Sequence, residues 1–374
     1  MSRDGQVLYL IAKSIAKRTG ETLDLEYVYS SRITWSLAPS NPQCLSKSDW
    51  LFSSFMKSNA ADLCDRLGIQ IENFRGQLTR SGVSLDPDER ADRPGQRAAL
   101  ERFVDREDVA AAVTPRITEA RDLLLDYARQ HFLTDAGTGL VDSGWTGRMV
   151  GSLVQVADKA GCSRPYVFFW GHEPRPDAWT DPQRLFAFMY DTVRGEGLKW
   201  RVPDAPFIVE TFCMGDHGIF GGYRRDEDGC VSAVLRSPRN TEAETWGLGL
   251  YRSTLLAFAE HTDPQLTGDA RPLIHELMQS FWVKPTRAEA SAWGSYPYDS
   301  DPTGTAARPL ARPFAATETL PRLLRGKIDR GDRAWLRGSL RLSHPIIRSI
   351  ATRRIDADEL AGAAPAAPAL DLHG

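Results

Sequence analysis

Apolar positions along the chain follow helical and strand periods in a repeating order. Helical spacing predicts an amphipathic helix over 5–18, and the alternation that follows predicts a strand over 23–29. The same order returns where an apolar run at Leu140 leads into a predicted helix over 147–160 and a fully apolar predicted strand over 166–170. Loop, helix and strand therefore occur twice, which predicts an α/β fold with a parallel sheet flanked by helices.

Three further local patterns are clear enough to predict an element. Apolar residues share one helix face over 116–131, and a second helical pattern covers 242–262. Two short alternating runs flank Asp226-Glu227-Asp228-Gly229, which predicts a β-hairpin.

The predicted α/β core takes up two stretches of the chain, residues 1–35 and 132–240. Helical patterns between them predict a hood-like helical insertion over 36–131. Residues 241–356 are expected to form a mainly helical, basic extension at the C-terminal end. The Ala- and Pro-rich residues 357–374 are expected to be a disordered tail.

Composition adds few constraints to this picture. Hydrophobic residues make up 42% of the chain and charged residues 25%, which is ordinary for a globular protein. A net charge of −3 gives no sign of a nucleic-acid partner. The five cysteines form no CxxC pair, so neither a zinc site nor a disulfide framework is indicated. We therefore expect a reduced, cytoplasmic protein.

One segment departs strongly from the average charge. Residues 308–354 contain 12 Lys or Arg and three acids, a local charge of about +9. Such a segment is suited to an anionic membrane surface, here the inner face of the membrane, or to a polyanionic acceptor. The alternative is a packed helix pair whose arginines extend to solvent.

The strongest chemical signal is the segment Asp142-Ser143-Gly144-Trp145-Thr146-Gly147. It joins the Leu140 strand to the following helix, whose first turn offers unpaired N–H groups and a partial positive charge to an anion. The glycines let backbone N–H groups approach such an anion, and Thr146 could add a hydroxyl or cap the helix. An Asp at a strand end suits ribose hydroxyls or the water shell of Mg²⁺. The alternative is an ordinary connector in which Thr146 is only a cap.

Other candidate groups lie on three further segments. Near the amino end, Arg3 could bind a phosphate in bidentate fashion, and Asp4 could orient it. Arg32 follows the predicted 23–29 strand and would point to the same crevice. Glu210 and His217 could remove a proton from an acceptor. For each group, a helix cap, a solvated side chain or a polar turn is the competing explanation.

Two of these segments resemble the ligand loops of type I phosphoribosyltransferases. Ser2-Arg3-Asp4-Gly5-Gln6-Val7-Leu8 resembles the pyrophosphate loop and its helix, and Leu140-Val141-Asp142-Ser143-Gly144-Trp145-Thr146-Gly147 resembles the loop that holds phosphoribosyl pyrophosphate (PRPP). The family usually has two acids in the second loop, whereas this chain has Asp142 followed by Ser143. The resemblance implies a phosphoribosyltransferase-like parallel sheet as the fold.

A closer resemblance is to a domain of bacterial polysaccharide-biosynthesis proteins that often follows a HAD-like phosphatase domain. It rests on Arg3-Asp4-Gly5, Tyr29-Ser30-Ser31-Arg32 and the Asp142–Gly147 loop, and it runs from residue 2 to about 340. The resemblance implies transfer of phosphoribosyl from PRPP, carried with Mg²⁺, to a glycan or lipid-linked acceptor of capsule or O-antigen. A HAD-like phosphatase partner would then remove the 5-phosphate.

The resemblance also implies a role for each candidate group. Asp142 and Ser143 would hold the ribose hydroxyls, with Asp142 also facing the metal, and Asp4, Glu210 or His217 would accept the proton of the attacking hydroxyl. The remaining candidates would bind phosphate: Gly144, Trp145, Thr146 and Gly147 the 5-phosphate, and Arg3, Gly5 and Arg32 the pyrophosphate.

Two other functions compete with this expectation. One is a glycosyltransferase that uses a nucleotide sugar, and the other is a non-catalytic PRPP-like scaffold for a partner phosphatase. The loss of the second loop acid favours the scaffold slightly. The family also has an apolar strand before the Arg3 loop, so we expect that the natural start of the chain lies upstream of Met1.

Overall fold

The computed structural model describes residues 5–52, 59–91, 93–133, 137–174, 178–197, 205–262, 270–298, 307–315 and 334–362. The chain divides into two compact units, one formed by 1–272 with 299–307 and the other by 273–298 with 308–374. Each unit is described by itself.

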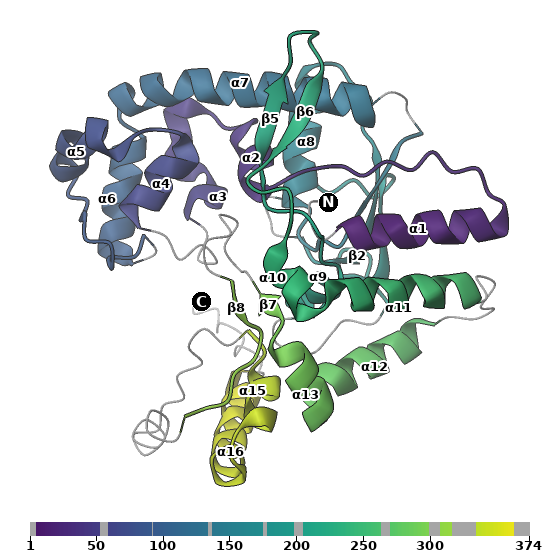
Figure 1. Ribbon diagram of the computed structural model, residues 1–374. Helices are drawn as coiled ribbons and strands as arrows, with labels where there is room; N and C mark the ends of the chain where they lie inside the picture. The colour runs from purple at the N-terminus through teal and green to yellow at the C-terminus, as the bar shows by residue number, and fades with distance from the viewer. Residues whose placement is uncertain are drawn as a thin grey trace, which may run out of the picture. The chain divides into compact units, whose positions relative to one another are not determined.

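The first unit is built on a small, mainly parallel sheet (Figure 1). Strands β1 (Gly139–Asp142), β2 (Tyr166–His172) and β3 (Leu185–Asp191) are parallel and adjacent in chain order, and β4 (Glu196–Gly197) pairs antiparallel with β3. The predicted strands at Leu140 and 166–170 are thereby confirmed. Strand β3 was not predicted.

Helix α8 (Arg148–Lys159) connects β1 to β2 and confirms the helix predicted over 147–160. Its buried face packs with residues of the sheet in one hydrophobic core. That core contains Val150, Leu153, Leu140, Val167, Phe169 and Leu185. The mixed α/β class with a three-stranded parallel sheet flanked by helices therefore follows from the alternation of apolar runs along the chain.

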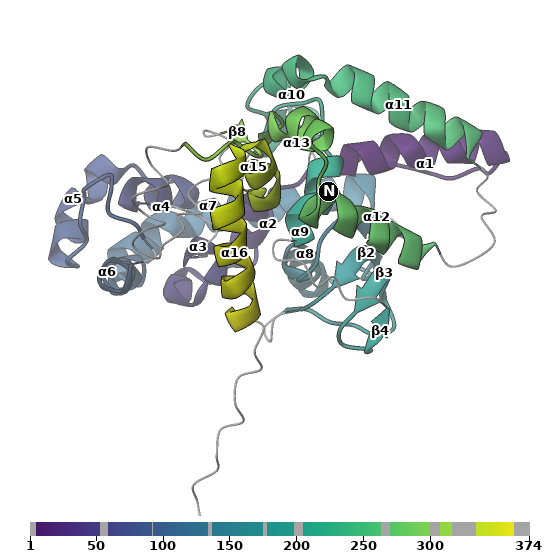
Figure 2. The same cartoon turned by 90° about the horizontal axis from the view of Figure 1, so that it is seen from below.

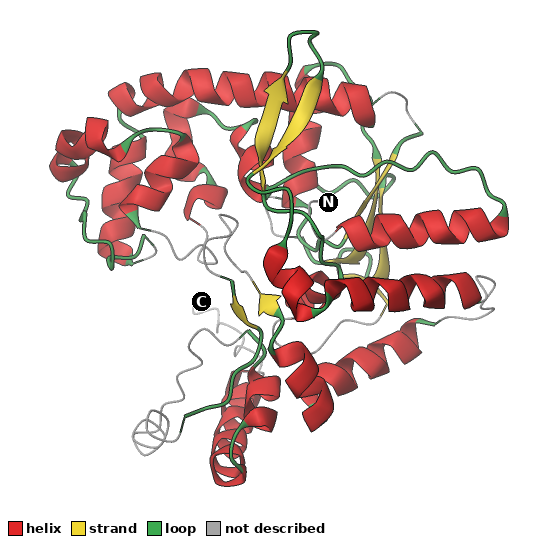
Figure 3. Ribbon diagram, in the orientation of Figure 1, coloured by secondary structure: helices red, strands yellow, loops and turns green. Residues whose placement is uncertain are grey.

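Helices in the predicted insertion form a second, separate core in the same unit, visible beside the sheet in Figures 1 and 3. The elements there are α2 (Arg32–Leu37), η2 (Pro42–Lys47), α3 (Asp49–Phe52), α4 (Ala60–Leu67), α5 (Ile71–Arg80), α6 (Pro94–Val104) and α7 (Glu107–His131). Helix α7 is longer than the predicted 116–131 and contains Pro115. It contributes Val113 and Ile117 to this core, and Leu124 and Tyr127 to the core beneath the sheet.

Two more predicted elements are present between 205 and 262. Strands β5 (Phe220–Arg225) and β6 (Val231–Leu235) form the predicted antiparallel hairpin. They follow α9 (Ala205–Phe212). The helix predicted over 242–262 is broken into α10 (Thr241–Trp246) and α11 (Leu248–His261), because Gly247 lies between them with a φ of 121°.

The strand predicted over 23–29 is wrong, although α1 (Gly5–Thr19) precedes it as expected. The segment is extended, but it joins no sheet of the described residues. Tyrosine hydroxyls take the place of a neighbouring strand at its end. The N–H of Tyr29 donates to Tyr127 Oη at 3.1 Å, and its carbonyl accepts from Tyr223 Oη at 2.6 Å. Alternation is thus a real property of this segment, but none of the described strands pairs with it.

One face of the sheet carries large apolar side chains in contact with solvent. Phe168, Phe186 and Phe188 are each more than a third exposed, and Val141 is 59% exposed. Phe168 stacks on Phe186 with ring centroids 5.3 Å apart. Parallel sheets are usually covered on both faces, so this exposed surface is unusual.

The second unit is mainly helical (Figure 2). Its elements are α12 (Arg271–Val283), which starts at the boundary, α13 (Arg287–Gly294), β7 (Pro297–Tyr298), β8 (Arg308–Pro309), α15 (Leu336–Leu342) and α16 (Pro345–Gly362). Trp335 is fully buried, and its ring stacks on that of Trp282 with centroids 5.4 Å apart. Its indole N–H donates to the carbonyl oxygen of Trp282 at 2.9 Å. None of the described helices combines the length and the apolar character needed to span a bilayer.

Candidate functional site

All three parallel strands end in a polar residue at the same edge of the sheet. Strand β1 ends at Asp142, β2 at His172 and β3 at Asp191. His172 and Asp191 are direct partners in the β2–β3 register. Because ligands of open α/β sheets bind beyond the carboxyl ends of the strands, this edge is the candidate site.

Asp142 is held by the loop that follows it. The backbone N–H groups of Ser143 and Gly144 donate to its carboxylate. Burial raises the pKa of the Asp142 carboxyl, while these two N–H groups and the nearby charge of Arg32 act in the opposite direction. Arg32 is the exposed first residue of α2, which packs against α8. Of the predicted site residues outside the loop, Arg32 is therefore within electrostatic range of Asp142.

Gly147 is the N-cap of α8, and the expectation that Thr146 caps this helix is wrong. Gly147 has a φ of 71°, which favours glycine, and a Cβ there would lie 3.2 Å from the Trp179 carbonyl oxygen. No side chain caps α8. The Thr146 hydroxyl has no hydrogen bond to any described residue, and its side chain is half-buried. The amino end of α8, which no side chain caps, and this hydroxyl are thus suited to an anion.

Trp145 covers the ends of β2 and β3. Its ring stacks on Tyr190 with centroids 5.9 Å apart, and a Cβ on Gly171 would come within 3.0 Å of it. Its carbonyl accepts the N–H of Glu173 at 2.9 Å. The loop therefore contacts the chain on both sides of His172.

His172 and Asp191 form a buried pair, with 2% and 4% of their surface exposed. His172 Nδ1 lies 3.2 Å from Asp191 Oδ1. The carboxylate is oriented by the turn after β3, where it also accepts the N–H of Val193 at 2.9 Å and of Arg194 at 3.3 Å. Since an ionised carboxylate only accepts hydrogen bonds, Nδ1 of His172 is the donor of this pair, and in the neutral ring Nε2 presents its lone pair.

Several buried polar atoms have no hydrogen-bond partner among the described residues, and two of those at this edge are considered as ligand contacts. They are His172 Nε2 and the indole Nε1 of Trp145, which is 8% exposed. A buried polar group left unpaired costs about 1–3 kcal/mol, so such groups are commonly kept for a ligand, a water molecule or a catalytic role. The candidate site thus has an unused acceptor and an unused donor beside the Asp142 loop.

The predicted proton acceptor His217 is already bonded at both ring nitrogens. Nδ1 lies 2.7 Å from the carbonyl oxygen of Gly218, and Nε2 lies 2.7 Å from the hydroxyl oxygen of Tyr27. Nδ1 must donate to the carbonyl, so Nε2 accepts from the tyrosine. In this arrangement the side chain has no lone pair left for a substrate. Glu210 lies half-buried on α9.

Asp216, next to His217, belongs to a structural network. It accepts from Gln6 Nε2 at 2.8 Å and from Arg252 Nη1 at 2.6 Å. Burial raises the pKa of Asp216, but the bonds from Gln6 and Arg252 outweigh it and lower the pKa below its usual value. These contacts tie the start of α1 to α11.

Most of the predicted pyrophosphate loop lies outside the described residues. Arg3 and Asp4 lie outside the described residues, and Gly5 is the first residue of α1. Across the part of the chain that is described, no three His, Cys, Asp or Glu side chains come together as metal ligands. Asp142 is the one predicted metal-facing carboxylate at this edge.

Sequence reasoning missed His172 and Asp191, although a signal was present. Each directly follows an apolar run, as Asp142 does. Three apolar runs that each end in Asp or His would have indicated one polar edge of a parallel sheet. No known family model matches this chain, and no curated protein sequence matches it significantly.

Proposed function

We propose that the Asp142–Gly147 loop binds the phosphate of a sugar phosphate, and that the protein transfers phosphoribosyl from Mg-PRPP to a glycan hydroxyl. The observation that carries the proposal is the uncapped amino end of α8, which follows the Asp142–Gly147 loop at the same polar edge of the sheet as the unpaired His172 Nε2. A helix amino end stabilises a phosphate, and a carboxylate beside it accepts ribose hydroxyls.

Different parts of the loop are assigned to the ribose and to the 5-phosphate of the proposed ligand. The N–H groups of Ser143 and Gly144 are directed to Asp142, so the 5-phosphate is assigned to Thr146, Gly147 and the first turn of α8. Asp142 would accept from the ribose hydroxyls and face the metal ion that arrives with PRPP. The pyrophosphate is assigned to Arg32, an exposed residue whose positive charge acts on the Asp142 carboxyl.

In the reaction, the bond from ribose C1 to the pyrophosphate oxygen breaks, and pyrophosphate leaves with the electron pair. The acceptor hydroxyl oxygen forms the new bond to C1. We assign its proton to His172 Nε2, with Asp191 holding the ring and stabilising the imidazolium that forms. His172 is 2% exposed, so the residues that cover Nε2 must move for the acceptor to reach it.

Calorimetry with Mg-PRPP tests the binding step. The native protein is expected to bind, and Thr146→Arg is expected to abolish binding because its side chain would occupy the phosphate space. Thr118→Arg, on the exposed face of α7, is the matched control and should bind normally. A folded native protein that ignores Mg-PRPP would contradict the proposal, and binding of UDP or GDP sugars in its place would identify a nucleotide-sugar enzyme.

Mass spectrometry of a lipid-linked glycan acceptor tests the transfer step. The expected result is a gain of one phosphoribosyl group in the presence of Mg-PRPP and native protein. Binding without any such gain would identify a scaffold, to be tested by capture of a HAD-like phosphatase. Vesicles with anionic lipids would test whether the basic segment 308–354 contacts the inner membrane face.

A further inference from the structure

One face of the sheet carries exposed rings on neighbouring strands. Phe168 on β2 is the register partner of Val141 on β1 and of Phe186 on β3. The rings of Phe168 and Phe186 are stacked with centroids 5.3 Å apart, and those of Trp170 and Phe188, closer to the carboxyl ends of the strands, are 5.5 Å apart. The three phenylalanines and Val141 are between 38% and 59% exposed. The four rings thus form an aromatic ladder that faces solvent along two strands.

The aromatic ladder leads to the polar edge of the sheet, where the candidate site lies. Trp170 lies two residues before His172, the last residue of β2. Val141 directly precedes Asp142, the last residue of β1. A chain-like ligand that lies along β2 on this face would therefore have one end at the candidate site.

Hydrogen-bond donors lie among these rings. The Arg184 guanidinium lies over the ring of Tyr166, 4.9 Å from its centroid, and the Arg194 guanidinium lies over the ring of Phe186 at 5.6 Å. The indole Nε1 of Trp170 is shielded from solvent and has no hydrogen-bond partner among the described residues. A purely apolar partner on this face would leave such N–H groups without acceptors, which is unfavourable.

A sugar chain is the ligand that suits the rings and the donors together. The C–H groups on one face of a sugar ring pack on the electron-rich face of an aromatic ring. The sugar hydroxyls can accept hydrogen bonds from guanidinium and indole N–H groups. Alternate residues of a strand are about 6.6 Å apart, so Phe168 and Trp170 offer two successive positions along one sugar chain.

The charges beside the aromatic ladder indicate that this sugar chain is neutral. Arg194 pairs with Asp191 at 3.7 Å. Arg164, just before β2, pairs with Asp158 at 2.8 Å and with Asp181 at 3.8 Å. These aspartates offset the arginines, whereas a surface for anionic lipid or nucleic acid carries an excess of positive charge.

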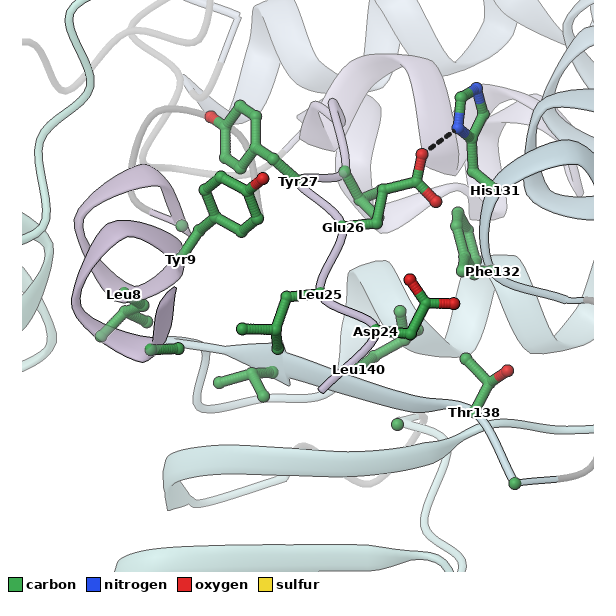
Figure 4. A pocket seen from close by; sticks show the side chains of 16 residues that line it. Leu8, Tyr9, Asp24, Leu25, Glu26, Tyr27, His131, Phe132, Thr138 and Leu140 are labelled. Atoms are coloured by element: carbon green, nitrogen blue, oxygen red, sulfur yellow. Dashed lines mark hydrogen bonds and ion pairs between the residues drawn. The ribbon is translucent and has the colours of Figure 1, made fainter. Parts of the chain in front are cut away.

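A groove between β1 and the extended segment that follows α1 is the alternative place for an acceptor (Figure 4). It has a volume of about 380 Å³. Leu25 and Leu140 line its apolar part, and Glu26 paired with His131 borders it. A volume of this size suits one small molecule. A chain of sugars is better suited to the open face of the sheet.

We infer that the aromatic ladder holds the acceptor glycan, as a chain of two or more neutral sugar residues that runs along β2 and ends at the polar edge of the sheet. The inference rests on the proposed function, because the transfer reaction requires the terminal hydroxyl of the acceptor at that edge. Binding of sugars to the ladder needs no PRPP, so it can be measured separately from the binding of Mg-PRPP.

An array of neutral and acidic bacterial surface oligosaccharides, probed with the full chain, tests the inference. The native protein is expected to retain at least one neutral oligosaccharide. In calorimetry with that oligosaccharide, Phe188→Ala should lower the affinity by at least about fivefold, because one ring of the ladder is lost, and Phe188→Trp should retain binding. Phe258→Ala, which removes a 67% exposed ring from α11, is the matched control and should bind normally.

Mg-PRPP binding by the native protein separates a failure of this inference from a failure of the proposed function. Native protein that binds Mg-PRPP but no oligosaccharide on the array would overturn the inference and leave the proposed function standing. Ladder-dependent binding of an oligosaccharide without any binding of Mg-PRPP would support the ladder and contradict the proposed function.

Three other results would also overturn the inference. One is equal oligosaccharide affinity in Phe188→Ala and the native protein, including the case in which only Ala12→Trp, which fills the groove, weakens binding. Another is retention of acidic oligosaccharides alone. The third is a native dimer in sedimentation that Phe188→Ala converts to a monomer while no sugar binds, because it would assign this face to a second copy of the chain.

Discussion

At the scale of single residues, the two histidines considered for proton transfer differ in the hydrogen bonds that they make. His217 is bonded to Tyr27 and Gly218, whereas His172 keeps one ring nitrogen unpaired beside the Asp142 loop. A buried histidine with an oriented carboxylate on one nitrogen and nothing on the other is suited to accept a proton. The role of His172 in proton transfer can therefore be tested separately from its contribution to packing.

His172→Gln is expected to lower phosphoribosyl transfer by about 10²–10⁴-fold, with Mg-PRPP affinity nearly unchanged, because a general base acts on the chemical step. Asp191→Asn should lower the rate of phosphoribosyl transfer and shift the pH dependence of that rate, because it changes the hydrogen-bond partner of His172 Nδ1. Transfer rates measured across pH 5–9 check both. His261→Gln, at the exposed end of α11, is the control. An unchanged rate and pH profile in His172→Gln would remove His172 from the mechanism.

Burial raises the pKa of Asp142, and this has opposite consequences for binding and for stability. Ligand binding needs the charged carboxylate, so Mg-PRPP affinity should fall as pH drops through a pKa above the ordinary value of about 3.9. A raised pKa means that the folded state favours the protonated form, so the charge destabilises the fold above that pKa.

Asp142→Asn should therefore weaken Mg-PRPP binding roughly tenfold or more while raising Tm at pH 7, because it removes a half-buried charge. Calorimetry and thermal unfolding of the same samples measure the two effects. A variant that binds normally, or one that loses stability at pH 7, would contradict this assignment of Asp142.

At the scale of elements, tyrosine hydroxyls substitute for strand pairing at the end of the extended segment. Trp35 donates to Tyr223 Oη at 2.8 Å, and Tyr223 donates to the Tyr29 carbonyl at 2.6 Å. Trp35 is fully buried, and burial raises the pKa of Tyr223 well above its usual value. This relay connects α2, β5 and residues 23–29 at one point.

Tyr223→Phe is expected to destabilise the protein by about 2–4 kcal/mol, because it leaves a buried indole N–H and a carbonyl without partners. Urea unfolding measures the change. Tyr9→Phe is the matched control and should cost less than about 0.5 kcal/mol, since the Tyr9 hydroxyl bonds to no described residue. Equal effects of the two substitutions would show that the relay adds nothing to stability.

Elements with a pattern of their own could be predicted from the sequence, and elements that depend on neighbours could not. Helix α8 and strands β1 and β2 carry complete local signals, namely apolar runs and a buried helix stripe. The extended segment 23–29 carries a strand pattern, but its pairing depends on backbone elsewhere. The His172–Asp191 pair joins residues from two strands, and only the register brings them together. Whether the fold is phosphoribosyltransferase-like stays a prediction.

At the scale of the whole molecule, α7 joins the two hydrophobic cores of the first unit. Ile117 is buried in the helical core, and Leu124 is buried in the core beneath the sheet, two turns farther along the same helix. A helix shared in this way cannot be lost from one core alone, because its turns form cooperatively. The two cores should therefore unfold as one.

Ile117→Ala and Leu124→Ala are each expected to cost about 2–5 kcal/mol and to shift a shared unfolding transition of both cores. Urea unfolding followed by amide exchange at Leu63 in one core and Leu153 in the other measures this. Separate transitions, with each substitution moving only its own core, would show that α7 does not couple them.

The solvent-facing rings on the sheet have a practical consequence for work at the bench. A fluorescent dye that binds exposed hydrophobic surface can bind to the folded protein at these aromatic rings, Phe168, Phe186 and Phe188. In melting assays with such a dye, the fluorescence of the folded protein would already be high, and it would increase only a little on unfolding. Circular dichroism or intrinsic tryptophan emission would report the melting of this protein more faithfully.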